Sequence, residues 1–130
     1  MILTLPMIMA AVSPEILAVG NSYRDLRNIK GHWGGGEPDE DVDNYNGKKH
    51  LAMQQLAQYF GKPGTKLADI QSAMGEPDVT RKDLIEANQP SSVSFEYYVY
   101  QWRGNHDFVW FRIDNAKNIV LKSAWYFAYE

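Results

Sequence analysis

The chain has 130 residues, of which 45% are hydrophobic and 22% are charged, and this composition can fill one modest core in a single domain. Its formal net charge of −3 and its scattered Lys and Arg residues provide no basic stripe for phosphates, so nucleic acid is not an expected partner. The absence of cysteine excludes disulfides, thiol catalysis and thiolate metal sites, and it favours a reducing compartment such as the cytoplasm.

The first segment, residues 1–19, is apolar enough to raise the question of a signal peptide or a membrane span. No Lys or Arg precedes its apolar run, and Pro6, Pro14 and Glu15 interrupt it well short of the ~20 apolar residues that a span needs. We therefore expect a buried arm or a first helix, with secretion as the less favoured alternative to a cytoplasmic location. A short helix is also expected in 22–29, where apolar residues recur at every third position.

Segment 31–47 contains five glycines and five carboxylates, a composition that predicts a loop without regular structure. A loop of this length in a compact domain is usually mobile or functional. Asp39, Asp41 and Asp43 have the spacing of the first ligands of a calcium loop. The pattern then fails, because Asn44 replaces the turn glycine and His50 replaces the final carboxylate. We expect a solvated acidic loop and no metal.

Two helices are expected next. Apolar residues recur at helical spacing from 48 to 60, and the Gly-Lys-Pro-Gly run at 61–64 should end this helix. Thr65 should cap a second helix that ends at Met74, followed by Gly75 in a left-handed conformation, while Pro77 prevents continuation. The two helices should form an antiparallel hairpin.

Three strands are expected at 93–102, 107–114 and 119–129, because short links with hairpin residues join these aromatic-rich segments. Alternation along each strand predicts a core-facing set: Val93, Phe95, Tyr97, Val99, Val109, Phe111, Ile113, Ile119, Leu121, Trp125 and Phe127. The opposite parity is too aromatic for a face that meets only water, and it comprises Tyr98, Tyr100, Trp102, Phe108, Trp110, Val120 and Tyr126. We expect the N-terminal arm, a second copy of the chain or a ligand to cover this second face.

The expected fold is one α+β domain, 1–130, in which a helix hairpin packs on one face of a three- to four-stranded antiparallel sheet. Residues 1–47 form an N-terminal arm and a Gly/Asp-rich loop, and residues 48–130 form the hairpin and a β-meander. Within 48–130, the stretch 65–78 (TKLADIQSAMGEPD), the YQW of 100–102, the FRID of 111–114 and the NIV of 118–120 resemble the SmpA/OmlA lipoprotein family. They resemble the β-lactamase-inhibitor-protein fold more loosely. The resemblance implies two helices on one face of a small sheet, with the free face or edge contacting other proteins.

Two functional alternatives follow. The first is a non-catalytic protein-interaction module that forms a homo-oligomer through its second sheet face, with Tyr98, Tyr100, Trp102, Phe108, Trp110 and Tyr126 as the partner face. The second is a carbohydrate-binding or hydrolytic protein that uses the 31–50 loop, with His32, Trp33, Asp41, Asp43 and His50 as candidates. Aromatic rings such as Trp33 and Tyr45 can stack on sugars, and paired carboxylates can supply acid and base.

Other chemistry has weak support in the sequence. His32, His50 and His106 lack the spacing of a metal site, and no Gly-x-Ser-x-Gly segment suggests a serine hydrolase. The glycines at 34–36 lack the Gly-Lys-Ser/Thr ending of a phosphate loop. We therefore expect no cofactor, and we favour binding over catalysis.

Overall fold

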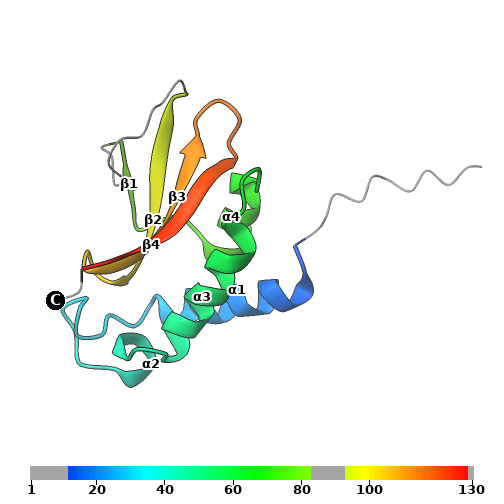
Figure 1. Cartoon of the computed structure of the whole chain (residues 1–130). Coiled ribbons are helices and arrows are strands. Elements are labelled where there is room, and N and C mark those ends of the chain that lie inside the picture. Colours follow the sequence, from blue (N-terminus) through cyan, green and yellow to red (C-terminus); the bar gives the residue numbers. More distant parts are fainter. Residues whose placement is uncertain (1–11, 83–92, 129–130) are drawn as a thin grey trace, which may run out of the picture.

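Helices come first along the chain and strands come last in the computed structural model, which describes residues 12–82 and 93–128. The elements are α1 (Pro14–Leu26), α2 (Glu40–Asp43), α3 (Lys48–Phe60), α4 (Leu67–Met74), β1 (Val79–Arg81), β2 (Phe95–Arg103), β3 (Asp107–Asp114) and β4 (Val120–Phe127). The strands form an antiparallel sheet in the order β1-β2-β3-β4, and the larger helices lie on one side of it (Figure 1). The predicted α+β class is therefore confirmed.

Helix α1 is longer than the helix predicted at 22–29. The Ser13 hydroxyl accepts a hydrogen bond from the Ile16 N–H, and Pro14 occupies the first helical position, so the sequence carries a complete start signal there. The Ser13 N–H also donates to the Tyr59 hydroxyl at 3.2 Å, which ties the start of α1 to α3. Residues 1–11 of the predicted arm lie outside the described residues.

Helix α1 crosses α4 at very short range. Gly20 is buried there, and a Cβ placed on it would lie 2.4 Å from the backbone oxygen of Ala73. The Arg24 guanidinium donates to the backbone oxygens of Ser72 and Ala73 at 2.7 and 2.8 Å. Helix α1 therefore supplies partners for carbonyls that the end of α4 leaves without intrahelical bonds.

The two predicted helices are present as α3 and α4, with two differences at their ends. Thr65 does not cap α4: the N-cap is Lys66, and the Thr65 hydroxyl donates to the Lys62 carbonyl instead. Gly75 has the expected positive φ of 79°, but its ψ of −167° lies in the extended glycine-only region and not in the left-handed helical region. Segment 31–47 also contains the short helix α2, which the prediction of an irregular loop missed.

The strand registers correct the predicted division of the sheet into two faces. Tyr98 pairs with Phe111, and Tyr100 pairs with Val109, so even-numbered residues of β2 lie opposite odd-numbered residues of β3. The prediction had placed residues of equal parity from both strands on one face. Parity along a strand is local, whereas the match between strands depends on the hairpin register.

The helix-facing side contains much of the predicted second face. Tyr98, Tyr100 and Trp102 pack with Val109, Phe111, Ile113, Val120, Trp125 and Phe127 against the helices. The other side carries Phe95, Tyr97, Val99, Phe108, Trp110 and Ala124. The predicted partner face is therefore split between the two sides of the sheet, which is a correction to the sequence analysis.

The side of the sheet away from the helices is not an open aromatic surface. Tyr97, Val99, Phe108 and Trp110 are each at most 4% exposed. Tyr126 is 43% exposed and stacks on Phe108 with ring centroids 4.9 Å apart. Strand β1, which the sequence analysis did not predict as a strand, pairs with β2 along this sheet.

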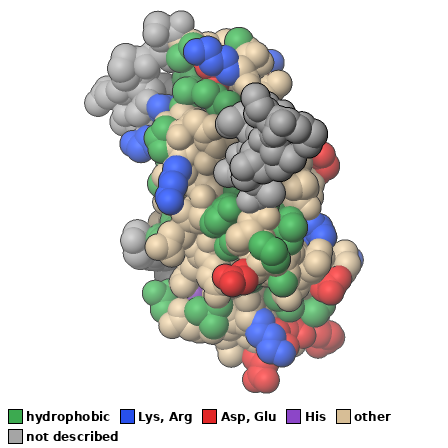
Figure 2. Space-filling model, turned by 90° about the vertical axis from the view of Figure 1, so that its right-hand side faces the viewer, with side chains coloured by type: hydrophobic (Ala, Val, Ile, Leu, Met, Phe, Trp, Pro, Cys, Tyr) green, Lys and Arg blue, Asp and Glu red, His purple; other side chains and the backbone are tan. Residues whose placement is uncertain are grey.

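The helix side of the surface is mixed in character. Figure 2 shows this side, and acidic side chains gather at the end of the molecule where Figure 1 places α2. This agrees with the sequence of α2, Glu-Asp-Val-Asp. None of the helices within 12–82 and 93–128 is both long and apolar enough to cross a membrane.

Replacing Gly20 with alanine should destabilise the fold, since the new methyl group would meet the Ala73 backbone. Overpacking of this kind costs roughly 1–3 kcal/mol, while alanine alone would favour a helix by about 0.5–1 kcal/mol. Urea unfolding of Gly20→Ala is therefore expected to show a lower midpoint. Ser22→Ala, at an exposed position of the same helix, is the control. A Gly20→Ala midpoint at or above that of the control would contradict the close crossing.

Candidate functional site

A pocket of about 230 Å³ lies where the 31–47 loop meets the ends of β2, β3 and β4. It is lined by Trp33, Tyr45, Trp102, Arg103, His106, Asp107, Phe127 and Ala128. We call it the aromatic pocket. A larger hollow of about 470 Å³ between α1 and α3 has no aromatic ring in its lining. The aromatic pocket is the stronger candidate because it combines flat apolar surfaces with a few polar groups, as ligand sites do.

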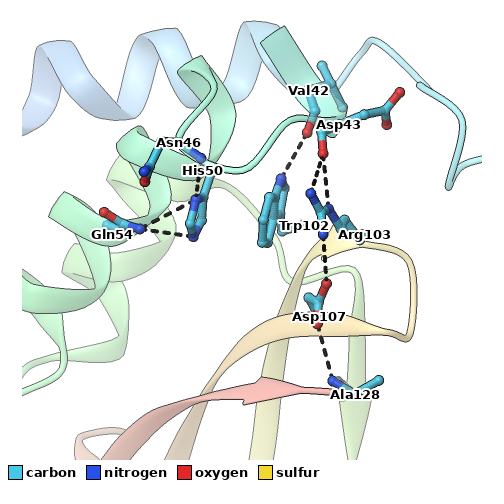
Figure 3. A network of polar contacts seen from close by, with 9 residues as sticks. All are labelled: Val42, Asp43, Asn46, His50, Gln54, Trp102, Arg103, Asp107 and Ala128. Carbon is cyan, nitrogen blue, oxygen red and sulfur yellow. Dashed lines mark hydrogen bonds and ion pairs between the residues drawn. The ribbon is translucent and has the colours of Figure 1, made fainter. Parts of the chain in front are cut away.

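Trp102 forms the inner wall of the aromatic pocket. It is 3% exposed, and its indole N–H donates to the Val42 carbonyl at 2.8 Å, so strand β2 holds helix α2 from a position 60 residues away (Figure 3). Its ring stacks on the imidazole of His50, with centroids 3.8 Å apart and planes 4° from parallel. Strand β2 is thereby bound to α2 by a buried hydrogen bond and to α3 by an aromatic contact.

His50 lies behind Trp102 and not in the aromatic pocket. It is 1% exposed, and its Nδ1 accepts the backbone N–H of Asn46 at 2.9 Å, so the neutral ring carries its proton on Nε2 beside the Gln54 amide (Figure 3). Burial and the nearby Arg103 cation both lower the pKa of His50. The ring is therefore a neutral structural group whose acceptor nitrogen is already occupied.

Arg103 connects the loop, the pocket and the sheet. Its Nε and Nη2 donate to the Asp43 carbonyl at 3.0 and 2.8 Å, and its Nη1 lies 3.6 Å from Asp107. The guanidinium lies over the Trp102 ring, 4.1 Å from its centroid, which is a cation–π distance. Asp107 also accepts the Ala128 N–H at 3.2 Å, so the polar groups of the pocket are preorganised (Figure 3).

The exposed wall of the aromatic pocket comes from the 31–47 loop. Trp33 is 37% exposed and packs edge-on against His106, with ring centroids 4.7 Å apart. Tyr45 is 68% exposed, and its ring lies 6.2 Å from that of Trp102. These two rings can reach a ligand, whereas Trp102 is already covered by His50 and Arg103.

The loop aspartates shape the backbone. The Asp39 carboxylate accepts the N–H groups of Asp41 and Val42 and so caps α2. The Asp43 carboxylate accepts the backbone N–H groups of His32 and Asp39. Burial alone would raise the pKa of Asp43, but the backbone N–H groups of His32, Asp39 and Trp33 outweigh it and lower the pKa.

The structure brings together one residue of the predicted ligand loop and several that were not selected. Of His32, Trp33, Asp41, Asp43 and His50, Trp33 lines the aromatic pocket; Asp43 and His50 support its walls, and Asp41 lies 3.9 Å from Lys48. Trp102, predicted for the partner face, lines the pocket instead. Arg103, Asp107 and Phe127 were missed, because contacts between hairpin ends and a distant loop leave no local pattern in the sequence. His106 had been considered only for a metal or acid-base site.

Within 12–82 and 93–128, no group of three or more His, Asp or Glu residues is arranged to hold a metal ion.

No protein-family model, curated protein sequence or solved structure significantly matches the chain. The resemblance to the SmpA/OmlA family therefore stays a prediction, and the function must be argued from the site.

Acidification should destabilise the protein partly through His50. Because its pKa is lowered in the folded state, the unfolded chain takes up the proton first, so stability that is present above about pH 6.5, the ordinary pKa of histidine, is lost as the pH falls below that value. We expect His50→Gln to flatten the pH dependence of the melting temperature over this range. Ser22→Ala, at an exposed position without a titratable side chain, should keep the wild-type slope. Equal slopes for His50→Gln and the wild type would contradict the buried neutral imidazole.

Calcium should not stabilise the protein, because backbone N–H groups already occupy the Asp39 and Asp43 carboxylates. An ion that bound the folded state at a hundredfold excess over its dissociation constant would add about 2.7 kcal/mol. Thermal melting with calcium, with magnesium and with a chelator should give the same midpoint. A calcium-specific rise that Asp41→Asn or Asp43→Asn abolishes would refute this and establish a metal site in the loop.

Proposed function

We propose that this protein is a non-catalytic binding module whose ligand is a carbohydrate held in the aromatic pocket. The observation that carries the proposal is the meeting of two exposed rings, Trp33 and Tyr45, with Arg103 and Asp107 around one hollow. Aromatic faces stack on the apolar faces of sugar rings, and charged side chains hydrogen-bond their hydroxyl groups.

The dimensions of the aromatic pocket suit a small group. Its volume of about 230 Å³ lies below the ~300–1,000 Å³ that is usual for drug-sized ligands. We infer that the pocket takes one sugar unit, such as the end of a glycan chain, while Tyr45 lies over it at the exposed rim. The remainder of such a chain would extend into solvent.

Binding is favoured over hydrolysis by the carboxylates in the pocket lining. Glycoside hydrolysis ordinarily uses a pair of carboxyl groups on either side of the scissile bond. The described residues that line the aromatic pocket include one carboxylate, Asp107, and it is engaged by Arg103 and by the Ala128 N–H. The Asp43 carboxylate, one of the candidates for the hydrolytic alternative, is bound to loop N–H groups.

Titration with sugars tests the proposal, with tryptophan fluorescence as the readout. A glycan array is screened first. The titration then uses glucose, galactose, N-acetylglucosamine and their β-linked disaccharides. For a sugar that binds, Tyr45→Ala should weaken affinity about tenfold, the loss of roughly 1.4 kcal/mol of ring contact. Tyr126→Ala is the matched control, since Tyr126 is also exposed but stacks on Phe108, away from the aromatic pocket. Absence of binding to every probe, or equal losses in both variants, would reject the proposal.

Self-association remains a second proposed property. The exposed ring of Tyr126 on the side of the sheet away from the helices favours a protein contact near β4. Tyr126 does not line the aromatic pocket, whereas the next residue, Phe127, does so on the helix side of the sheet.

A further inference from the structure

Strand β4 forms an edge of the sheet, and the turn before α4 binds its first residue along that edge. The Val120 N–H donates to the Thr65 carbonyl, and the Gly64 N–H donates to the Val120 carbonyl, both at 2.8 Å. From 121 to 127, no strand of the described residues lies beyond β4 (Figure 1). An edge of this length is a template for a further strand.

The direction of the backbone groups along β4 follows from its pairing with β3. The Ala128 N–H donates to the His106 carbonyl, and at the other end the Asp114 N–H donates to the Ile119 carbonyl. Since backbone groups alternate along an antiparallel strand, the β4 residues that face β3 are Lys122, Ala124 and Tyr126. Ser123 and Trp125 therefore direct their N–H and C=O groups away from the sheet.

A groove of about 330 Å³ follows this edge on the helix side. Its lining comprises Gln54, Ala57, Gln58, Gly61 and Lys62 from α3 and the turn after it, with Ser123, Ala124 and Trp125 from β4. Ser123 and Trp125 are partly exposed. A strand added beside β4 would therefore have both backbone partners and space for its side chains.

We propose that the added strand is β4 of a second copy, paired antiparallel about a two-fold axis at Ala124, so that one sheet runs through both chains. The segment without a neighbouring strand, 121–127, is centred on Ala124, so this register uses its full length and ends where Thr65 and Gly64 begin to cover Val120. In this register Ser123 of each chain exchanges both backbone hydrogen bonds with Trp125 of the other. A two-fold contact of this kind closes on itself and forms a dimer, not a filament.

The side chains also fit this register. On the helix side, Ser123 lies opposite Trp125 of the second copy, so a small residue faces a large one. On the other side, Lys122 lies opposite the exposed ring of Tyr126, a favourable cation–π pairing. A register centred on Lys122 would instead place two lysines opposite each other, and one centred on Trp125 would oppose two indoles.

Proline at Ser123 tests the backbone pairing. Ser123→Pro removes an N–H that points away from β3, so the pairing with β3 is left in place. Analytical ultracentrifugation should show a dimer for the wild type and for the control Ser123→Ala, which keeps the N–H. Ser123→Pro should raise the dimer dissociation constant at least roughly tenfold, with an unchanged far-UV circular dichroism spectrum. A monomeric wild type across micromolar to millimolar concentrations would overturn the proposal.

Cross-linking tests the register without relying on a destabilised variant. The chain has no cysteine, so Ala124→Cys introduces a single thiol. In the proposed dimer the two copies of residue 124 form a non-hydrogen-bonded pair with Cα atoms about 4.5 Å apart, which is within the range for a disulfide. Ala124→Cys should oxidise to a covalent dimer, while Thr80→Cys, exposed on β1 at the opposite edge, should do so much more slowly. Equal rates would reject the two-fold axis at Ala124.

Neither test involves the aromatic pocket, so loss of sugar binding and loss of dimerisation are separate outcomes.

Discussion

The guanidinium of Arg27 joins the helices to the sheet through several contacts. Its Nη1 donates to the Met74 carbonyl at 2.8 Å, and its Nη2 pairs with Asp78 at 3.0 Å. The same group lies 5.4 Å from the ring centroid of Tyr23 and 5.6 Å from that of Tyr100. The side chain that follows the last residue of α1 thus contacts the end of α4, the turn into β1 and a core ring of β2. Burial raises the pKa of both tyrosines, so they stay neutral beside the cation.

The position of β2 then determines where the aromatic pocket forms. Asp78, held by Arg27, accepts the Gln101 N–H at 2.7 Å, just before the irregular pairing between Gln101 and Arg103. Beyond this irregularity, Trp102 and Arg103 bind the last carbonyls of α2. A β-bulge turns the strand locally and redirects side chains, and such bulges are common beside functional sites. The contact between α1 and α4 is therefore linked, through β2, to the wall of the pocket.

The sequence predicted elements where the determinants are local and failed where they are not. Helix α3 has clear apolar spacing and a glycine at its end, and β3 has the predicted bounds, 107–114, because hairpin residues flank both its ends. A buried arm or a first helix was expected in 1–19, but the start of the helix was not placed, although Ser13 and Pro14 mark it. The sheet faces depend on the match between two strands, and the pocket depends on bonds such as Trp102 to Val42 across 60 residues. A carboxylate such as that of Asp39 or Asp43 can accept backbone N–H groups or bind a metal ion. Only the positions of the surrounding backbone groups show that both carboxylates accept N–H groups.

The few long-range bonds of Trp102 and Arg103 have a consequence for the order of folding. The bonds from Trp102 and Arg103 to loop 31–47 can form only after the β2–β3 hairpin exists. Bringing these distant segments together costs chain entropy that local helix formation does not cost. We infer that the pocket is assembled late and that its opening is a local event, with a smaller free energy than unfolding of the core. Backbone amides of the loop would then exchange with solvent faster than those of α3 or β3. The rim of the pocket could adjust to a ligand while the sheet beneath it stays intact.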